Sequence, residues 1–226
     1  MEQVTHEFAE FLSTIFPFWD KITKEEQLLL CRNTHKVSYT QGANVHGVNH
    51  ACTGPIIVIS GKVRAYMLSE DGKDITLYRL FPNDLCMLSA SCVIEAITFD
   101  VYIDAEVDTE AILINSAVFS GLSKKNVYVE NFALKTATAR FSEVMWTMQQ
   151  MLFMKFDKRL AVFLIDELAR TGGDTVFLTQ EQIAKYMSSA REVVSRMLKH
   201  FSSEGLVKVS RGEVKVLDKK GLKSLL

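Results

Sequence analysis

The chain of 226 residues has few cysteines, no long apolar run and almost no net charge. It contains 4 cysteines and has a formal net charge of −1 at pH 7. A run of about 18 apolar residues, which a membrane-spanning helix requires, does not occur. A charge this close to zero argues against a protein that binds polyanions through charge alone. The hydrophobic fraction of 48% is ample for a core, and the length predicts one or two domains.

The cysteines and the N-terminus indicate where the protein works. Cys31, Cys52, Cys86 and Cys92 lie at irregular spacings, so they form no disulfide framework. The N-terminus has no basic region followed by an apolar core, as a secretion signal would have. We therefore expect a cytoplasmic protein with reduced thiols and no contact with a membrane.

The most informative stretch, residues 178–205, predicts two short helices joined by a tight turn. Thr179 with Gln182, and Ser189 with Glu192, have the spacing of capping boxes, in which two residues satisfy each other's free backbone donors. Two or three residues separate the predicted helices, so the helices must cross at a steep angle, as in a helix-turn-helix.

The second of these helices has an apolar back and a polar front. Helical spacing predicts a buried stripe of Val193, Val194, Met197, Leu198 and Phe201. The polar front holds Arg191, Glu192, Ser195, Arg196 and Lys199. An arginine matches the O6 and N7 acceptors of guanine, a glutamate can accept from the N4 amine of cytosine, and a serine can do either. Glu192, Ser195 and Arg196 are spaced i, i+3 and i+4, so they can reach one stretch of major groove.

A predicted hairpin follows at residues 207–217, with Arg211 and Gly212 at its tip and valines at every second position. Together, the helices and the hairpin predict a winged helix that binds double-stranded DNA. The side chains expected at the DNA are Thr179, Gln180, Ser189, Arg191, Glu192, Ser195, Arg196, Lys199 and Arg211.

Charge supports this interpretation only weakly. From residue 156 onward there are about 13 Lys and Arg against about 9 Asp and Glu, whereas the rest of the chain has about 13 against about 18. An excess this small fits a few phosphate contacts, so we expect binding to depend on base readout and to be regulated.

Short strands are predicted ahead of the winged helix, after a helical segment with a capping box at Thr23 and Glu26. The strands fall at residues 55–61, 63–68, 75–81, 99–107 and 110–114. Ser60-Gly61 and Asp71-Gly72 mark turns between them. Many short strands with regular turns predict an antiparallel β-roll or jelly roll.

A helix without glycine or proline is predicted from about residue 127 to 157. Its apolar residues step by three and four, a heptad seam of Leu134, Ala137, Phe141, Val144, Met148 and Met151. We expect this seam to pair with its twin in a homodimer; the alternative is a core helix packed on its own sensor domain. The predicted α+β chain therefore comprises a β-roll with N-terminal helices at 1–120, a dimerisation helix at 121–156 and a winged helix at 157–226.

These features resemble the Crp/Fnr superfamily of bacterial transcription regulators almost end to end. Glu192, Ser195 and Arg196 are similar to the Glu-x-x-Ser-Arg form of the recognition helix in the fumarate-nitrate-reduction branch. The resemblance implies TTGA-like half-sites, with Arg196 on the guanine and Glu192 on a cytosine or adenine amine. It also implies a cyclic-nucleotide-binding-like sensor roll and action on RNA polymerase.

The turn departs from the family pattern at two positions. Ser188 stands where the family usually has a glycine, and a residue other than glycine in a left-handed turn costs on the order of 1 kcal/mol. Ala190 stands where a small hydroxylated residue is usual. Capping by Ser189 is expected to compensate for the missing hydroxyl.

The sequence does not identify the effector. Family members that bind cyclic nucleotide have a Gly-Glu pair where Met87 and Leu88 stand, and no arginine occurs between Arg79 and Arg140. A buried cyclic phosphate with no cation opposite it is severely destabilised, so cyclic AMP is not expected. The expected pocket would suit a partly apolar small molecule. Its predicted residues are Leu85, Cys86, Met87, Ser89, Ser91 and Cys92.

Metal and redox alternatives are less well supported. The N-terminal cysteine cluster of the oxygen-sensing branch is absent, so an iron–sulfur cluster is not expected. Haem held by His46, His50 or a cysteine stays open, and so does a redox switch that uses Cys86 and Cys92.

Two rival functions belong to other classes. A cupin-like metal-binding enzyme with an appended helical domain would need a ligand set that the sequence does not offer. A winged helix used only for protein contacts would show no salt-dependent binding to duplex DNA. The sequence therefore favours a regulator that is not an enzyme.

Overall fold

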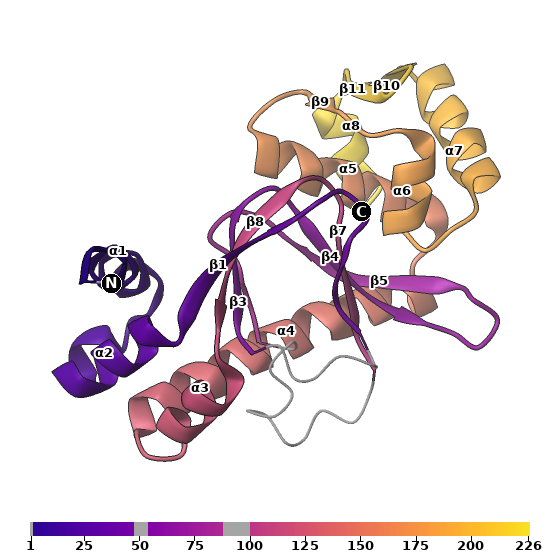
Figure 1. Cartoon of the computed structure of the whole chain (residues 1–226). Helices are drawn as coiled ribbons and strands as arrows, with labels where there is room; N and C mark the ends of the chain where they lie inside the picture. Colours follow the sequence, from indigo (N-terminus) through magenta and orange to yellow (C-terminus); the bar gives the residue numbers. More distant parts are fainter. Residues whose placement is uncertain (1, 48–53, 88–99) are drawn as a thin grey trace. The chain divides into compact units, whose positions relative to one another are not determined.

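The computed structural model describes residues 2–47, 54–87 and 100–226. These form two compact units. The first comprises Met1–Leu68 and Leu77–Val144, and the second comprises Ser69–Thr76 and Met145–Leu226. Helices and antiparallel strands occupy largely separate stretches of the chain, in the α+β arrangement that the sequence predicts (Figure 1).

The N-terminal half holds short helices on either side of the strands. The helices are α1 (Glu2–Ile15), η1 (Trp19–Lys21), α2 (Lys24–Arg32) and α3 (Ser116–Ser123). The strands are β1 (Thr34–Tyr39), β2 (Asn44–His46), β3 (Ile56–Ser60), β4 (Val63–Leu68), β5 (Asp74–Leu80), β6 (Leu85–Cys86), β7 (Tyr102–Ala105) and β8 (Thr109–Ile114).

The strands form two antiparallel sheets, in the orders β1-β8-β3-β6 and β2-β7-β4-β5. Both sheets contribute to one buried cluster, in which Val58 and Ala111 come from the first sheet and Ala65 and Ile103 from the second. Two sheets that share one core make the predicted β-roll. Strands β1, β2 and β6 did not stand out in the sequence, because β6 is two residues long and β1 is mostly exposed.

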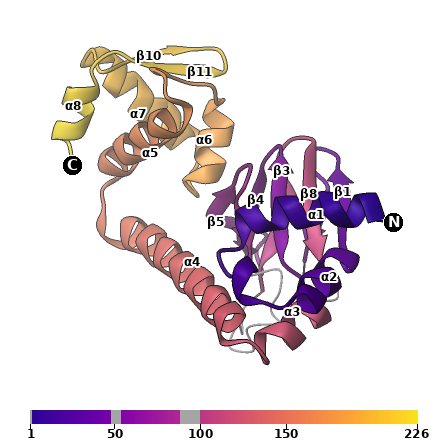
Figure 2. The same ribbon diagram turned by 90° about the vertical axis from the view of Figure 1, so that its left-hand side faces the viewer.

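Aromatic packing joins the N-terminal helices to one face of the roll. The rings of Phe16 and Phe18 are stacked with their centroids 4.8 Å apart, and Phe132 meets both rings edge-on. The same cluster includes Ile112 of β8. Figure 2 shows α1, α2 and α3 gathered around the roll. The predicted capping box at the start of α2 is confirmed, with Thr23 and Glu26 bonded to each other in both directions.

Helix α4 (Val127–Phe153) runs uninterrupted for 27 residues (Figure 2). The long helix predicted in this region is confirmed, although it ends at Phe153, before the predicted end near residue 157. Helix α5 (Phe156–Thr171) begins three residues later. Within the described ranges, no helix is long and apolar enough to cross a membrane.

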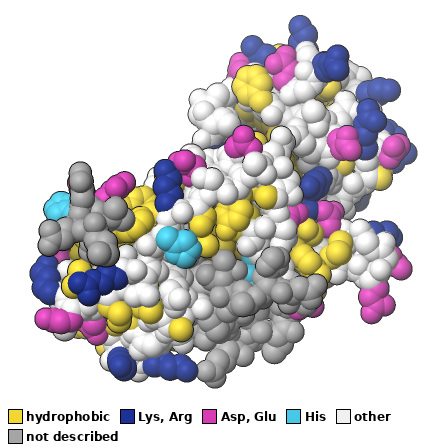
Figure 3. Space-filling view, in the orientation of Figure 1, with side chains coloured by type: hydrophobic (Ala, Val, Ile, Leu, Met, Phe, Trp, Pro, Cys, Tyr) yellow, Lys and Arg dark blue, Asp and Glu magenta, His cyan; other side chains and the backbone are white. Residues whose placement is uncertain are grey.

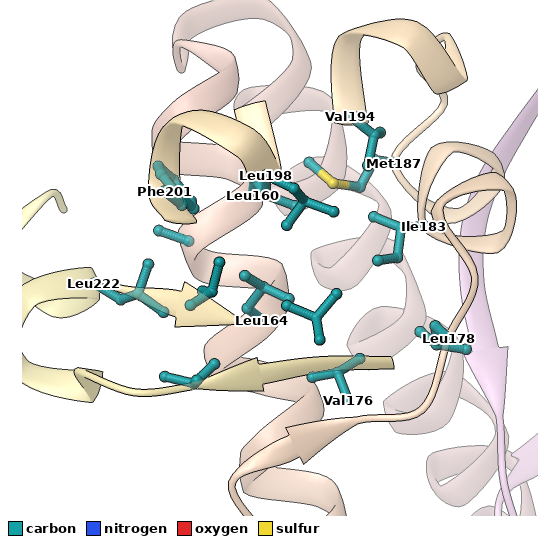
Figure 4. Close-up of a cluster of buried hydrophobic side chains, with 14 of the residues drawn as sticks. Leu160, Leu164, Val176, Leu178, Ile183, Met187, Val194, Leu198, Phe201 and Leu222 are labelled. Atoms are coloured by element: carbon teal, nitrogen blue, oxygen red, sulfur yellow. The ribbon is translucent and has the colours of Figure 1, made fainter. Parts of the chain in front are cut away.

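The C-terminal part is a small helical domain with a three-stranded sheet. After α5 come β9 (Thr175–Val176), α6 (Gln180–Tyr186), α7 (Arg191–Ser203), β10 (Val207–Ser210), β11 (Glu213–Val216) and α8 (Lys219–Ser224). The sheet order is β10-β11-β9. Figure 4 shows side chains from every helix of this domain converging on one buried cluster, with Leu164 and Leu198 among them.

Two glycines at turns between strands, Gly61 and Gly72, have left-handed backbones. Gly61, between β3 and β4, has a φ of +87°, and a Cβ there would lie 2.5 Å from the carbonyl oxygen of Asp108. Gly72 has a φ of +76°, and nothing lies within 4 Å of an added Cβ. Both substitutions pay for a left-handed backbone, but only Gly61→Ala adds a backbone collision.

We therefore expect Gly61→Ala to lower the free energy of unfolding by about 2–5 kcal/mol, and Gly72→Ala to lower it by about 1 kcal/mol. Urea unfolding of the two variants beside the parent measures both values. Equal losses would contradict the close approach at Gly61.

Candidate nucleic-acid interface

Helix α6 begins with the predicted capping box. The Thr179 side chain accepts from the backbone N–H of Gln182 at 3.1 Å, and the Gln182 side chain accepts from the backbone N–H of Thr179 at 2.8 Å. This prediction is confirmed. The box fixes where the helix starts, and it holds Thr179 and Gln180 at the exposed end of α6.

Helix α6 ends in a left-handed turn. Ser188 has a φ of +49°, so it adopts the left-handed conformation although it is not a glycine. The backbone N–H groups of Ser188 and Ser189 donate to the carbonyls of Lys185 and Ala184, at 3.2 and 2.9 Å. This pair of bonds is the Schellman arrangement that closes a helix and redirects the chain.

The start of α7 corrects two predictions. Four residues, Met187 to Ala190, separate the helices instead of two or three. The N-cap is Ala190, which makes no side-chain cap bond, so the predicted capping box of Ser189 and Glu192 is wrong, and so is the expected compensation by Ser189. The physical reason is register: the turn takes up Ser189, whose N–H closes α6, so Ser189 falls one residue ahead of the cap position.

The apolar back of α7 is confirmed. Val194, Leu198 and Phe201 are at most 1% exposed, and Val193 and Met197 are half-buried. Figure 4 shows Leu198 and Phe201 pointing into the cluster that contains Leu160 and Leu164 of α5. This packing leaves the opposite side of α7 facing outward.

The outward side carries the predicted polar front. Arg191, Glu192, Arg196 and Lys199 are exposed, and Ser195 is half-buried. All five side chains line one open concave surface of about 360 Å³. Figure 3 shows Lys and Arg side chains along the edge where Figure 1 places α7, interspersed with acidic ones. This surface therefore carries charges of both signs.

The wing forms a second concave surface beside this one. Strands β10 and β11 pair in register from Val207 with Val216 to Ser210 with Glu213, which confirms the predicted hairpin. A cleft of about 370 Å³ lies between the wing and the start of the two helices. Its lining includes four of the predicted DNA-contacting residues, Thr179, Gln180, Arg191 and Arg211. Ser189 lines neither of these two surfaces.

The predicted seam of α4 divides into two groups. Leu134, Phe141 and Met148 are 54%, 65% and 50% exposed. Ala137, Val144 and Met151 are only partly accessible, and Val144 packs against the core of the roll. Sequence reasoning missed two exposed apolar residues beside the first group, Met145 and Leu152. Their spacing of three and four from Phe141 and Met148 was the available signal.

Half of the predicted effector pocket can be placed. Leu85, Cys86 and Met87 are all buried, whereas Ser89, Ser91 and Cys92 lie outside the described residues. Leu85 and Met87 point into the cluster under the N-terminal helices, and Cys86 points into the core of the roll. The Sγ of Cys86 lies 3.7 Å from the hydroxyl of Tyr78, and burial raises the pKa of Tyr78 well above its ordinary value.

Arg140 of α4 is a neighbour of this stretch that sequence reasoning missed. Its guanidinium donates to the Leu85 carbonyl at 3.4 Å and to both carboxylate oxygens of Glu143, at 3.0 and 2.8 Å. It also lies 5.1 Å from the centre of the Tyr78 ring. Nothing in the sequence placed Arg140 here, because its position depends on how α4 packs on the roll.

Metal ligands do not gather in the part of the chain that the structure describes. No group of three His, Cys, Asp or Glu side chains there could hold a metal ion. His46 is buried, and His50 and Cys52 lie outside the described ranges.

Helices α6 and α7 and the hairpin of β10 and β11 give the C-terminal domain the architecture of a winged-helix DNA-binding module. A family model described as a Crp-like helix-turn-helix domain matches residues 158–225. A crystal structure assigned to the Crp/Fnr family of transcriptional regulators, from Eubacterium rectale, is 40% identical. The match covers 94% of this chain and 98% of the chain in that crystal structure, with a TM-score of 0.85.

Two curated proteins show weaker similarity over most of the chain. The cyclic AMP receptor protein of Thermus thermophilus is 23% identical over 200 residues, which are 88% of this chain and 92% of that protein. The transcriptional activator protein FnrA of Stutzerimonas stutzeri is 26% identical over 179 residues, which are 74% of this chain and 70% of that protein. The chain belongs to the Crp/Fnr family, and it is a transcription regulator with a helix-turn-helix DNA-binding domain.

The uncapped start of α7 gives a stability prediction. Ala190 is exposed and has the extended backbone of an N-cap, but it carries no acceptor for the free N–H groups of the first turn. Ala190→Ser supplies that acceptor, so we expect the free energy of unfolding to rise by about 1 kcal/mol. Ser189→Ala is the matched control and should change it by less than about 0.5 kcal/mol. Chemical denaturation measures both, and a loss of about 1 kcal/mol in Ser189→Ala would restore Ser189 as the cap.

Proposed function

We propose that the regulator works in the cytoplasm as a homodimer that reads palindromic TTGA-like half-sites with the polar front of α7. The observation that carries this proposal is the common concave surface lined by Glu192, Ser195 and Arg196. Their side chains offer the acceptor, the hydroxyl and the two-pronged donor that distinguish base pairs in the major groove. Arg196 contacts the guanine, and Glu192 accepts from a cytosine or adenine amine.

Phosphate contacts come from around this reading surface. Thr179 and Gln180 lie at the start of α6, where a hydroxyl and a side-chain amide can bond phosphate oxygens. Arg211 at the wing tip and Arg191 share the neighbouring cleft with them. Lys199, on the far side of the reading residues, adds a positive charge without a fork that could select a base. These groups would fix the register of the domain on the duplex.

The apolar stripe on α4 supports dimerisation. At 100° per residue, Leu134, Phe141, Met145, Met148 and Leu152 fall within a sector of about 60°. Each of them is at least 44% exposed. A continuous exposed stripe of this kind marks a surface that a partner covers, and a second copy of α4 matches its length and spacing. Pairing of the two helices would present two α7 helices to a palindrome.

The effector of the proposed regulator is a small, partly apolar molecule held near Leu85 and Met87. We do not expect cyclic AMP to act here, because the guanidinium nearest to this stretch, Arg140, is engaged by Glu143 at 2.8 Å. Binding would shift the dimer between two arrangements of its DNA-reading domains, and so change the access of RNA polymerase to the promoter.

Substitution of Arg196 tests the base contact. Arg196→Ala should weaken binding to a TTGA palindrome by about 1–3 kcal/mol per half-site and relax the preference at the guanine. Lys199→Ala is the control: it should weaken matched and mismatched duplexes alike and lower the salt slope by about one. Fluorescence anisotropy at several salt concentrations measures both. Unchanged preference in Arg196→Ala would remove Arg196 from the readout.

Substitution of Phe141 tests the dimer. Phe141 is 65% exposed in the single chain, so Phe141→Glu should leave the fold intact while burying a charge in any paired seam. We expect sedimentation velocity to show a monomer. Ser142→Glu, a charge on an exposed neighbouring position outside the stripe, should remain a dimer. A Phe141→Glu variant that stays dimeric would mean that the pair forms through another surface.

A further inference from the structure

The turn between α6 and α7 is tied to α5 by a half-buried arginine, Arg159. Arg159 lies in the first turn of α5, and its Nη2 donates to the backbone carbonyl of Met187 at 2.6 Å. Met187 is 5% exposed and is the C-cap of α6, directly before the left-handed Ser188. Arg159 therefore contacts the turn from α5, on the side opposite to the outward face of α7.

The Met187 carbonyl needs a donor from outside its own helix. The last carbonyls of a helix have no partner within it. In α6, those of Ala184 and Lys185 accept from the turn itself, through the N–H groups of Ser189 and Ser188. The Met187 carbonyl accepts from Arg159 instead. A cation at this end of the helix also complements its partial negative charge.

The surroundings hold the guanidinium in place. Its carbon lies 5.8 Å from the centre of the Phe156 ring, and burial lowers the pKa of Arg159 from its ordinary value. Around it, the end of α4 together with α5 and α6 leaves a cavity of about 130 Å³, lined by Met151, Phe163 and Met187 among others. A half-buried side chain that donates a hydrogen bond at 2.6 Å restricts the peptide that it holds.

That peptide sets the direction of the reading helix. Met187 stands four residues before Arg191, the first residue of α7. No side-chain bond caps α7, because its N-cap is Ala190, so the start of α7 has no cap of its own to orient it. A small rotation at the turn is carried along a rigid helix and moves the side chains that must reach base edges.

We infer that Arg159 is a positioning residue for base readout: its bond to Met187 aims α7, although Arg159 itself touches no DNA. This rests on the proposed readout by α7. Loss of the bond should blunt discrimination between bases without removing any phosphate contact. Phosphate contacts tolerate a shifted helix better than base contacts do, because bidentate base contacts require a fixed geometry.

The test compares Arg159→Met with Arg159→Lys and with the control Arg170→Met. Arg170 lies on the same helix and pairs with Glu167 at 2.6 Å, away from the turn. Each variant is titrated with a TTGA palindrome and with a duplex in which the guanine is replaced, at several salt concentrations. The readout is the ratio of the two Kd values, together with the salt slope.

Arg159→Met should lower the Kd ratio about tenfold, while affinity for the mismatched duplex and the salt slope stay at parent values. Arg159→Lys, which keeps a cationic donor, should recover most of the ratio, and Arg170→Met should match the parent. A merely structural role would lower the melting temperature and leave the ratio of the folded protein unchanged, which would overturn the inference.

Three further outcomes keep the result unambiguous. If Arg159→Met does not fold at the assay temperature, Arg159→Ala, which also lacks a donor, takes its place, and a full parent ratio in that variant would overturn the inference. If the parent protein itself fails to discriminate between the duplexes, the proposed readout by α7 fails. If the parent discriminates and Arg159→Met does so equally well, only the role of Arg159 fails.

Discussion

Burial of the apolar side of α7 against α5 is the interaction on which the DNA-binding domain depends. A helix of 13 residues is marginal by itself in water, so its stability must come from packing. Val194, Leu198 and Phe201 are essentially inaccessible and meet Leu160 and Leu164 of α5. Because side chains on one helix have fixed relative directions, burying these three turns the polar residues of α7 outward as a set.

A second constraint of the same kind acts on α4. One side of this helix packs against its own roll, as the contact of Val144 with the core of the roll shows. The neighbouring side leaves large apolar residues such as Phe141 and Leu152 more than 60% exposed. A helix with one apolar side buried and another uncovered fits a chain that completes its packing with a second copy. The reading helices and the unpaired stripe therefore support the same conclusion, a regulator that binds DNA as a pair.

The proposed effector region lies against both the roll and α4. Leu85 and Met87 belong to the apolar cluster under the N-terminal helices, and Arg140 links the same stretch to α4 through the Leu85 carbonyl. A molecule bound near these residues would touch both the roll and the helix that carries the apolar stripe. This arrangement gives a physical route from a small ligand to the dimer, because α4 takes part in both contacts.

The sequence predicted what depends on local pattern and missed what depends on register and long-range packing. The box at Thr179, the wing and the long helix all leave short-range signals. The cap at Ser189 was misplaced by one residue, since the turn has four residues and uses the Ser189 N–H to close α6. Arg140 and Arg159 gave no local signal, because each acts on a backbone carbonyl more than 25 residues away along the chain.

The most direct test of DNA binding by a symmetric dimer varies the distance between the two half-sites. Two reading helices in a symmetric dimer should require half-sites centred about one turn of DNA apart. We would compare the Kd for a TTGA palindrome of that spacing with the Kd after insertion of about half a turn between the half-sites. The account predicts that the insertion reduces affinity to that of a single half-site. Equal affinity for the two duplexes would show that each chain binds DNA alone, and would contradict the account.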